Sequence, residues 1–365
     1  MTDSASDLSI YLHWPFCRSK CPYCDFFSRV QKNVDQNKII DGYLNQLEKY
    51  KELLPERKII SVFFGGGTPS LIQPQNIERI LNKITALWPT DEHIEITLEA
   101  NPNTQTPTLF ADLRQSGINR LSLGVQSLDD QGLKFLGRTH TAREALSAID
   151  SVLKNFDNHS VDLIYALPNQ TLAGWQKQLD TLCAFGLKHI SLYQLTIEEN
   201  TLFFRKNIKP LDEEKATELY AETEKFLAPK GYLKYEVSNY AQNGFASKHN
   251  LVYWTGRDYI GIGQTAHGRF KKDNRFFAQT DLVHLEELSP EERAEELILM
   301  GLRLTKGLNK DRFAEIIGQP LETFLDTSFK KEALSENLIE ETNDTLKASA
   351  KGFLLLDYIL PRLVA

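Results

Sequence analysis

The chain is poor in cysteine and lacks any long hydrophobic run. Its 365 residues contain four cysteines, too few for the disulfide-rich scaffolds of small secreted proteins. No stretch reaches the roughly 18 unbroken apolar residues of a membrane-spanning helix. The N-terminal residues Met1–Asp7 are polar and acidic, whereas a signal peptide would be basic and then apolar. We therefore expect a cytoplasmic protein.

An excess of basic residues is also missing. The formal net charge is −7, and no long block of Lys or Arg occurs along the chain. This balance argues against nucleic acid as a partner. The remaining composition, 41% hydrophobic and 25% charged, is ordinary for a soluble enzyme with one large and one small domain.

Three of the four cysteines, Cys17, Cys21 and Cys24, lie within eight residues. An odd number of close cysteines argues against disulfides. A structural zinc site needs four ligands, usually as two separated pairs, and a second CxxC or an HxxxH is absent. An iron–sulfur cluster on three thiolates would leave one iron open to an exogenous ligand. Cys183 stands apart on a helical pattern, where a free cysteine acts as a small apolar residue.

Strand and helix patterns alternate six times along the first 195 residues. Strands are expected at 8–14, 59–64, 93–98, 120–125, 161–164 and 189–195, and helices at 35–54, 74–88, 108–116, 141–156 and 172–185. The alternation predicts an α/β fold with a parallel sheet. Periodicity does not separate a doubly wound sheet from a barrel, but both place ligands at the carboxyl ends of the strands.

Candidate ligand residues follow several of these strands. Gly65-Gly66-Gly67-Thr68 could be a tight turn or a phosphate loop, although the Gly-Lys-Ser/Thr of a Walker loop is absent. Glu99 ends the third strand, as either a ligand or a solvated acid, and Arg138 offers a planar fork to a carboxylate. Asp162 lies within an apolar run, where a carboxylate is costly unless it has partners.

The CxxxCxxC spacing after Tyr11-Leu-His-Trp-Pro-Phe resembles the radical S-adenosylmethionine (SAM) superfamily. The narrower likeness is to the branch that contains oxygen-independent coproporphyrinogen III oxidases and HemW-type haem chaperones. The resemblance implies a partial (β/α)6 TIM-like barrel, a [4Fe–4S] cluster on Cys17, Cys21 and Cys24, and SAM on the open iron. It implies SAM contacts at Gly66, Gly67, Thr68, Glu99, Gln126, Arg138 and Asp162, and further contacts at Tyr11, Tyr23 and Thr196.

The segment His249-Asn250-Leu-Val-Tyr253-Trp254 follows a helix expected at 212–230. By pattern alone it is an irregular core segment rich in aromatic residues. It resembles the HNxxYW motif that is associated with haem binding in HemW-type proteins. The resemblance implies haem contacts at His249, Asn250, Tyr253 and Trp254, with His249 as the first candidate for the axial ligand and His267 as the second.

The composition changes after residue 285, so we expect two domains, 1–285 and 286–365. Helices are expected at 288–300, 310–317 and 320–329, and residues 331–365 as another helix and a two-stranded turn ending in Phe353–Leu360. The pattern resembles the small, mainly α-helical, winged-helix-like C-terminal domain of the same branch. Without a basic face, such a domain is interpreted as a lid or an interaction module.

Two functions fit the resemblance, and the residue two positions after Cys24 separates them. The oxidase pattern resembles CxxxCxxCxC and follows a longer N-terminal extension, whereas this chain has Phe26 at that position and 16 residues before Cys17. We therefore expect a haem chaperone that delivers haem to apoproteins, with coproporphyrinogen III oxidase as the alternative and other radical chemistry as a third. Membrane-associated protein partners and a homodimer remain open.

Overall fold

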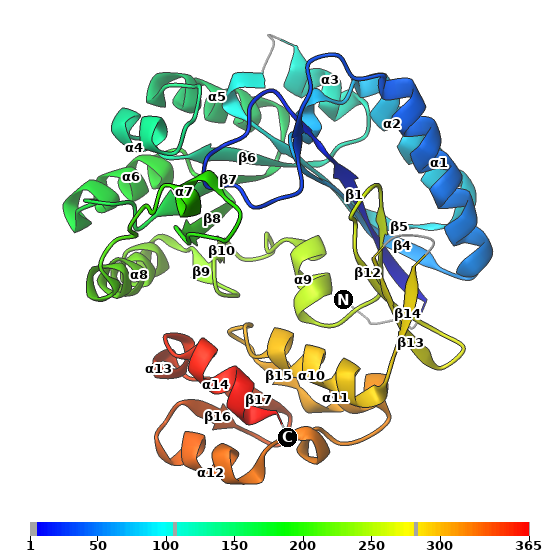
Figure 1. Ribbon diagram of the computed structural model, residues 1–365, viewed down its shortest axis with the longest axis vertical. Coiled ribbons are helices and arrows are strands. Elements are labelled where there is room, and N and C mark those ends of the chain that lie inside the picture. Colours follow the sequence, from blue (N-terminus) through cyan, green and yellow to red (C-terminus); the bar gives the residue numbers. More distant parts are fainter. Residues whose placement is uncertain (1–5, 105–107, 281–283, 365) are drawn as a thin grey trace.

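A computed structural model describes residues 6–104, 108–280 and 284–364. Within them the chain forms a large curved sheet with helices on its outer face and a small C-terminal unit beside it (Figure 1). None of the helices in these ranges is long and apolar enough to cross a bilayer. Met1–Ala5, part of the stretch behind the expectation of no signal peptide, lie outside the described residues.

Six parallel strands form the centre of the sheet and neighbour one another in chain order. They are β1 (Asp7–Trp14), β4 (Lys58–Gly66), β5 (Thr90–Ala100), β6 (Arg120–Gln126), β7 (Asn158–Tyr165) and β8 (His189–Gln194). The connecting helices are α1 (Gln36–Leu53), α2 (Pro74–Leu87), α3 (Leu109–Gln115), α4 (Asp130–Phe135), α5 (Ala142–Asn155) and α6 (Leu172–Ala184). Because these helices cover the outside of a curved sheet (Figure 1), the expected partial (β/α)6 barrel is confirmed.

Short strands extend both edges of the sheet. β11 (Tyr259–Ile262) pairs in parallel with β1, and β12 (Gly268–Lys272), β13 (Arg275–Gln279) and β14 (Leu285–Leu288) continue antiparallel. At the other edge β10 (Asn239–Ala241) joins β8 and β9 (Leu233–Lys234) joins β10. Among the described strands β9 and β14 end the sheet without pairing to each other, so the barrel is open.

The helix boundaries follow from capping. Asp35 accepts a hydrogen bond from the backbone of Lys38 at 3.2 Å and starts α1. Thr141 and Glu144 form a reciprocal capping box that starts α5. These side chains satisfy backbone N–H groups that have no partner within the helix. Both helices therefore begin one residue after the expected positions 35 and 141.

Side-chain alternation divides each strand between the helical layer and the barrel interior. In β1, Leu8, Ile10 and Leu12 are at most 1% exposed and belong to the main hydrophobic core. On the opposite face the hydroxyl of Ser9 lies 2.7 Å from that of Ser61 on β4. Because successive side chains of a strand point to opposite faces, Ser9 and Ser61 lie in the interior of the barrel.

Three helices follow the last parallel strand among the described residues before β11: α7 (Leu202–Arg205), α8 (Glu213–Leu227) and α9 (Lys248–Trp254). The helix expected at 212–230 is α8 followed by a 3-10 turn, Ala228–Lys230, and it ends at Gly231 with φ of 85°. The segment expected to be irregular, His249–Trp254, is helical and forms most of α9.

The C-terminal unit combines helices with a three-stranded sheet of order β15-β17-β16. Its elements are α10 (Pro290–Gly301), β15 (Leu308–Asn309), α11 (Lys310–Ile317), α12 (Thr327–Ser335), β16 (Ile339–Glu341), β17 (Thr345–Ala348), α13 (Ala350–Phe353) and α14 (Leu356–Leu363). It has its own hydrophobic core. Phe276 of β13 also packs into that core, and the division at residue 285 stays a prediction.

Two expectations for this unit are wrong. The helix expected at 320–329 is a 3-10 turn, Leu321–Phe324, followed by α12. The two-stranded turn expected to end at Phe353–Leu360 is formed by β16 and β17 and ends at Ala348. Phe353 ends α13, and residues 356–360 belong to α14, where Leu356, Ile359, Leu360 and Leu363 are buried at helical spacing.

Candidate functional site

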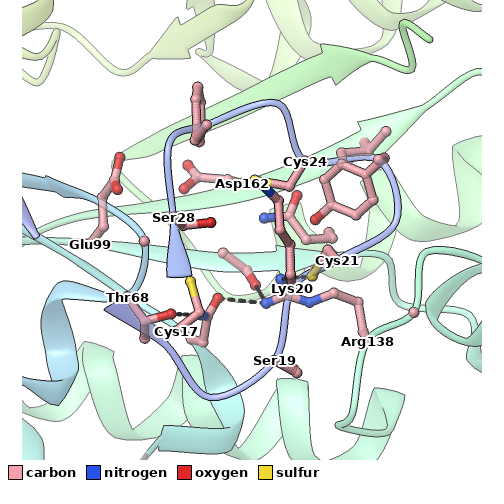
Figure 2. A pocket seen from close by; sticks show the side chains of 18 of the residues that line it. Cys17, Ser19, Lys20, Cys21, Cys24, Ser28, Thr68, Glu99, Arg138 and Asp162 are labelled. Atoms are coloured by element: carbon pink, nitrogen blue, oxygen red, sulfur yellow. Dashed lines mark hydrogen bonds between the residues drawn. The ribbon is translucent and has the colours of Figure 1, made fainter. Parts of the chain in front are cut away.

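One cavity of about 450 Å³ opens at the carboxyl ends of the parallel strands. Figure 2 shows its side chains coming from the cysteine loop after β1, the glycine loop after β4, and strands β5 and β7. In barrels of this kind, ligands bind at this end because the strands point several loops toward one volume.

The cysteine loop starts as a continuation of β1. Cys17 lies in β2 (Phe16–Cys17), which pairs in parallel with β3 (Arg29–Val30). This pairing holds the two ends of the cysteine loop next to each other. Within it the backbone N–H of Cys24 donates to the carbonyl of Cys21 at 3.2 Å. All three thiols are free and line the cavity, whereas Cys183 on α6 is not among the lining residues.

The glycine loop lies directly against the cysteine loop. The N–H of Gly67 donates to the carbonyl of Trp14 at 2.7 Å, and that of Thr68 to the carbonyl of Phe16 at 2.9 Å. A Cβ atom on Gly67 would lie 3.0 Å from the sulfur of Cys17. Gly66 has φ of 109°, a region that side chains disfavour. The two glycines therefore permit a close approach of backbone to the cysteine loop.

Arg138 ties three parts of the cavity together. Its guanidinium donates to Cys21 Sγ at 3.4 Å, to Asn101 Oδ1 at 2.5 Å and to the carbonyl of Gly124 at 2.9 Å. Asn101 in turn donates to the hydroxyl of Thr68 at 3.2 Å. The cation therefore lies beside a cysteine sulfur and connects the cysteine loop to the residues that follow β5 and α4.

Two carboxylates, Glu99 and Asp162, line the cavity. Asp162 accepts hydrogen bonds from Ser122 at 2.8 Å and Ser160 at 3.1 Å, and burial raises its pKa. Glu99 accepts a hydrogen bond from the N–H of Gly66 at 3.2 Å. Burial, and then the nearby charge of Asp162, raises the pKa of Glu99 to about 8. Near neutral pH the free cavity thus holds a proton that a bound cation would displace.

The structure brings together most of the residues expected at the cofactors. The lining includes Cys17, Cys21, Tyr23, Cys24, Gly66, Gly67, Thr68, Glu99, Gln126, Arg138, Asp162 and Thr196. Tyr11 is not among the lining residues, and its hydroxyl lies 3.0 Å from Nδ1 of His13. Tyr11 therefore lies below the cavity, inside the barrel.

The residues expected at haem lie outside the cavity lining. Those on α9 are His249, Asn250, Tyr253 and Trp254. His249 is 0% exposed, and its nitrogens lie 2.8 Å from the hydroxyls of Ser61 and Tyr253. His267 is exposed on the loop between β11 and β12. An axial ligand needs a free nitrogen that haem iron can reach, and of the two candidates the exposed His267 has the more accessible imidazole.

The lining also includes residues that were not predicted as site residues from the sequence, among them Asn101, Ser28 and Tyr193. Asn101 orients both Arg138 and Thr68, and its place between a strand end and Pro102 is the signal that could have identified it. The hydroxyl of Ser28 is buried and has no hydrogen-bond partner in the described structure. No sequence pattern singles it out.

The raised pKa of Glu99 predicts a pH-dependent stability. Because its folded-state pKa of about 8 exceeds the usual 4.5, the folded protein holds an extra proton between these values, and its stability falls as pH rises through that window. Glu99→Gln should therefore melt close to wild type at pH 5.5 and above it at pH 8.5. The measurement is the melting temperature across this range without ligand.

A matched control is Glu92→Gln, since the Glu92 side chain is 85% exposed. This variant should follow the wild-type pH profile. If Glu99→Gln also follows it, Glu99 does not hold a proton in the folded protein.

Residues 11–182 match the radical SAM superfamily, and residues 288–355 match the HemN C-terminal domain. The "Heme chaperone HemW" of Buchnera aphidicola subsp. Schizaphis graminum is 36% identical over 367 residues, which cover 97% of each chain. The protein of the same description from Haemophilus influenzae is 36% identical over 378 residues, again 97% of each chain.

Among solved structures, coproporphyrinogen III oxidase (HemN) from Escherichia coli superposes with a TM-score of 0.81. The match covers 98% of this chain and 89% of that one at 19% identity, and it shows a shared fold. The sequence identity of 36% over almost the full length identifies the family within that superfamily. It belongs to the HemW family of the radical SAM superfamily.

Proposed function

We propose that the chain is a haem chaperone that carries a [4Fe–4S] cluster and SAM, binds haem and delivers it to apoproteins. The observation that carries the choice is Phe26. Phe26 lines the cavity and is 59% exposed. It stands two positions after Cys24, where the pattern of the oxidases has a further cysteine. The relatives called haem chaperones, 36% identical over nearly the full chain, support the same choice.

The cysteine loop has the donor set for a cluster. Within the described residues, no three His, Cys, Asp or Glu side chains converge closely enough to hold a single metal ion. In a [4Fe–4S] cluster each thiolate binds a different iron, so spread-out thiols around one cavity fit a cluster better than a zinc ion. Burial raises the pKa of Cys24 to about 11, so cluster assembly must release its proton.

The rest of the cavity has groups that suit SAM. Glu99 could accept from an ammonium group, and Asp162, oriented by two serines, could accept from ribose hydroxyls. The close packing of Gly66 and Gly67 on the cysteine loop leaves room for a ligand beside the thiols. A reduced cluster with bound SAM supplies one-electron chemistry; the chain supplies binding, orientation and enclosure.

Haem ligation is proposed for His267. Its exposed loop follows β11, which runs parallel to β1 and ends at the same edge of the sheet as the cysteine loop. The same loop lies close to His13, since a Cβ atom on Gly263 would lie 2.7 Å from the His13 carbonyl oxygen. An exposed imidazole at this edge can reach a haem iron without rearrangement of the core.

Each cysteine of the loop should be required for the cluster. Cys17→Ala, Cys21→Ala and Cys24→Ala are each expected to abolish the iron–sulfur absorbance after reconstitution, because each removes one of three protein ligands. Cys183→Ala, outside the cavity, is the matched control and should retain it. A wild-type spectrum in any loop variant would overturn the ligand assignment.

The reconstituted protein should bind haem and should not convert coproporphyrinogen III to protoporphyrinogen IX. Haem titration followed by the Soret band, beside a porphyrin fluorescence assay of the same preparation, measures both. Robust conversion would show that the protein is a coproporphyrinogen III oxidase. Absence of haem binding would contradict the proposed function as a haem chaperone.

His267→Ala should weaken haem binding and shift the Soret maximum, because it removes the proposed axial nitrogen. His93→Ala is the control, since the His93 side chain is 80% exposed and lies away from the cavity lining. An unchanged Soret band in His267→Ala would show that the axial ligand lies elsewhere.

A further inference from the structure

The helix α9, which carries the HNxxYW segment, lies across the open side of the barrel, between the sheet and the C-terminal unit (Figure 1). It touches β4, β5 and β11 through side chains: His249 packs on Phe63, Glu95 bonds its first turn, and Tyr253 meets Tyr259 edge-on at 4.7 Å. The segment therefore packs against the inner face of the barrel strands, although its residues do not line the cavity.

A buried carboxylate fixes the start of α9. Glu95, 4% exposed, accepts hydrogen bonds from the backbone of His249 at 3.0 Å and of Lys248 at 3.1 Å. Arg120, 2% exposed, lies 3.9 Å from the same carboxylate. Since backbone N–H groups at a helix start need acceptors, Glu95 determines where His249 sits.

The imidazole of His249 is fully engaged. One nitrogen lies 2.8 Å from the hydroxyl of Ser61, which itself contacts Ser9, and the other lies 2.8 Å from the hydroxyl of Tyr253. Burial, with the charge of Arg120 adding to it, lowers the pKa of His249 to about 3. The ring is thus a neutral member of a satisfied network.

From this ring a continuous column of side chains leads to the cysteine loop. His249 stacks on Phe63 with centroids 5.0 Å apart, and Phe63 on Tyr11 at 6.2 Å, both at an interplanar angle of 25°. The hydroxyl of Tyr11 bonds to Nδ1 of His13, whose Nε2 bonds to the carbonyl of Phe27 at 2.9 Å. Phe27 lies three residues after Cys24, so the column ends on the loop that carries the thiols.

The geometry points to His249 as a positioning residue that supports the cysteine loop through Phe63, Tyr11 and His13, and not as a haem ligand. Packed interiors transmit displacement because they contain little free volume. Loss of the His249 ring lets Phe63 and Tyr11 relax, which loosens the His13 bond to the loop. This inference rests on the proposed use of the cavity for the cluster and SAM.

The test compares two replacements of His249 in the reconstituted full-length protein. His249→Ala removes the ring. The double variant His249→Phe/Tyr253→Phe keeps a flat ring on Phe63 and also removes the hydroxyl that a single change would leave without a partner. The measurements are SAM affinity, the electron paramagnetic resonance spectrum of the reduced cluster with and without SAM, and the Soret maximum of bound haem.

His249→Ala should bind SAM about tenfold more weakly, equivalent to losing one moderate interaction, and should alter the cluster spectrum with SAM. The double variant should return to within about threefold of wild type. The Soret maximum should be unchanged in both, because neither loses an axial nitrogen. If His249→Ala cannot be purified, Phe63→Leu removes the middle of the column and should weaken SAM binding similarly.

Three results would overturn the inference: unaltered SAM affinity in the variant that lacks the column, failure of the double variant to restore it, or a shifted Soret maximum in either His249 variant. The last would return His249 to the role of haem ligand. Wild-type protein that binds no SAM would contradict the proposed function itself, so the two failures are distinguishable.

Discussion

The parallel pairing of β1 with β4 is the constraint on which the cavity depends. It continues past the strands as hydrogen bonds from Gly67 to Trp14 at 2.7 Å and from Thr68 to Phe16 at 2.9 Å. These bonds hold the glycine loop and the cysteine loop side by side. A Cβ atom on Gly67 would lie 3.0 Å from the Cys17 sulfur. A larger residue at position 67 would therefore displace the Cys17 thiol.

The barrel could be predicted from sequence because its strands and helices are long and periodic. Buried residues recur at helical spacing in α2 and α5, and capping side chains mark helix starts. The edge strands were missed because two to five residues, as in β9 and β12, do not show a period. Residues Phe353–Leu360 were misassigned because a short apolar run fits strand or helix until its packing partners are known.

The cavity residues were largely predictable for a topological reason. Parallel strands end at one edge, so Glu99, Gln126 and Asp162, far apart in sequence, meet in one volume. The positions of Tyr11 and His249 were not predictable, because each depends on partners from other elements, His13 for one and Ser61 and Glu95 for the other. An aromatic residue and a histidine suit a ligand site and a polar core equally well.

Hydrogen bonding distinguishes the groups of the barrel that can bind a ligand from those that support the structure. Both nitrogens of His249 are bonded, so that ring has no capacity left for a ligand. At the cavity, Glu99 accepts a hydrogen bond from the N–H of Gly66, and the buried hydroxyl of Ser28 has no hydrogen-bond partner within the described residues. Because an unsatisfied buried polar group is costly, the Ser28 hydroxyl marks a point in the cavity that a bound ligand can complete, whereas the His249 ring belongs to a network that is already complete.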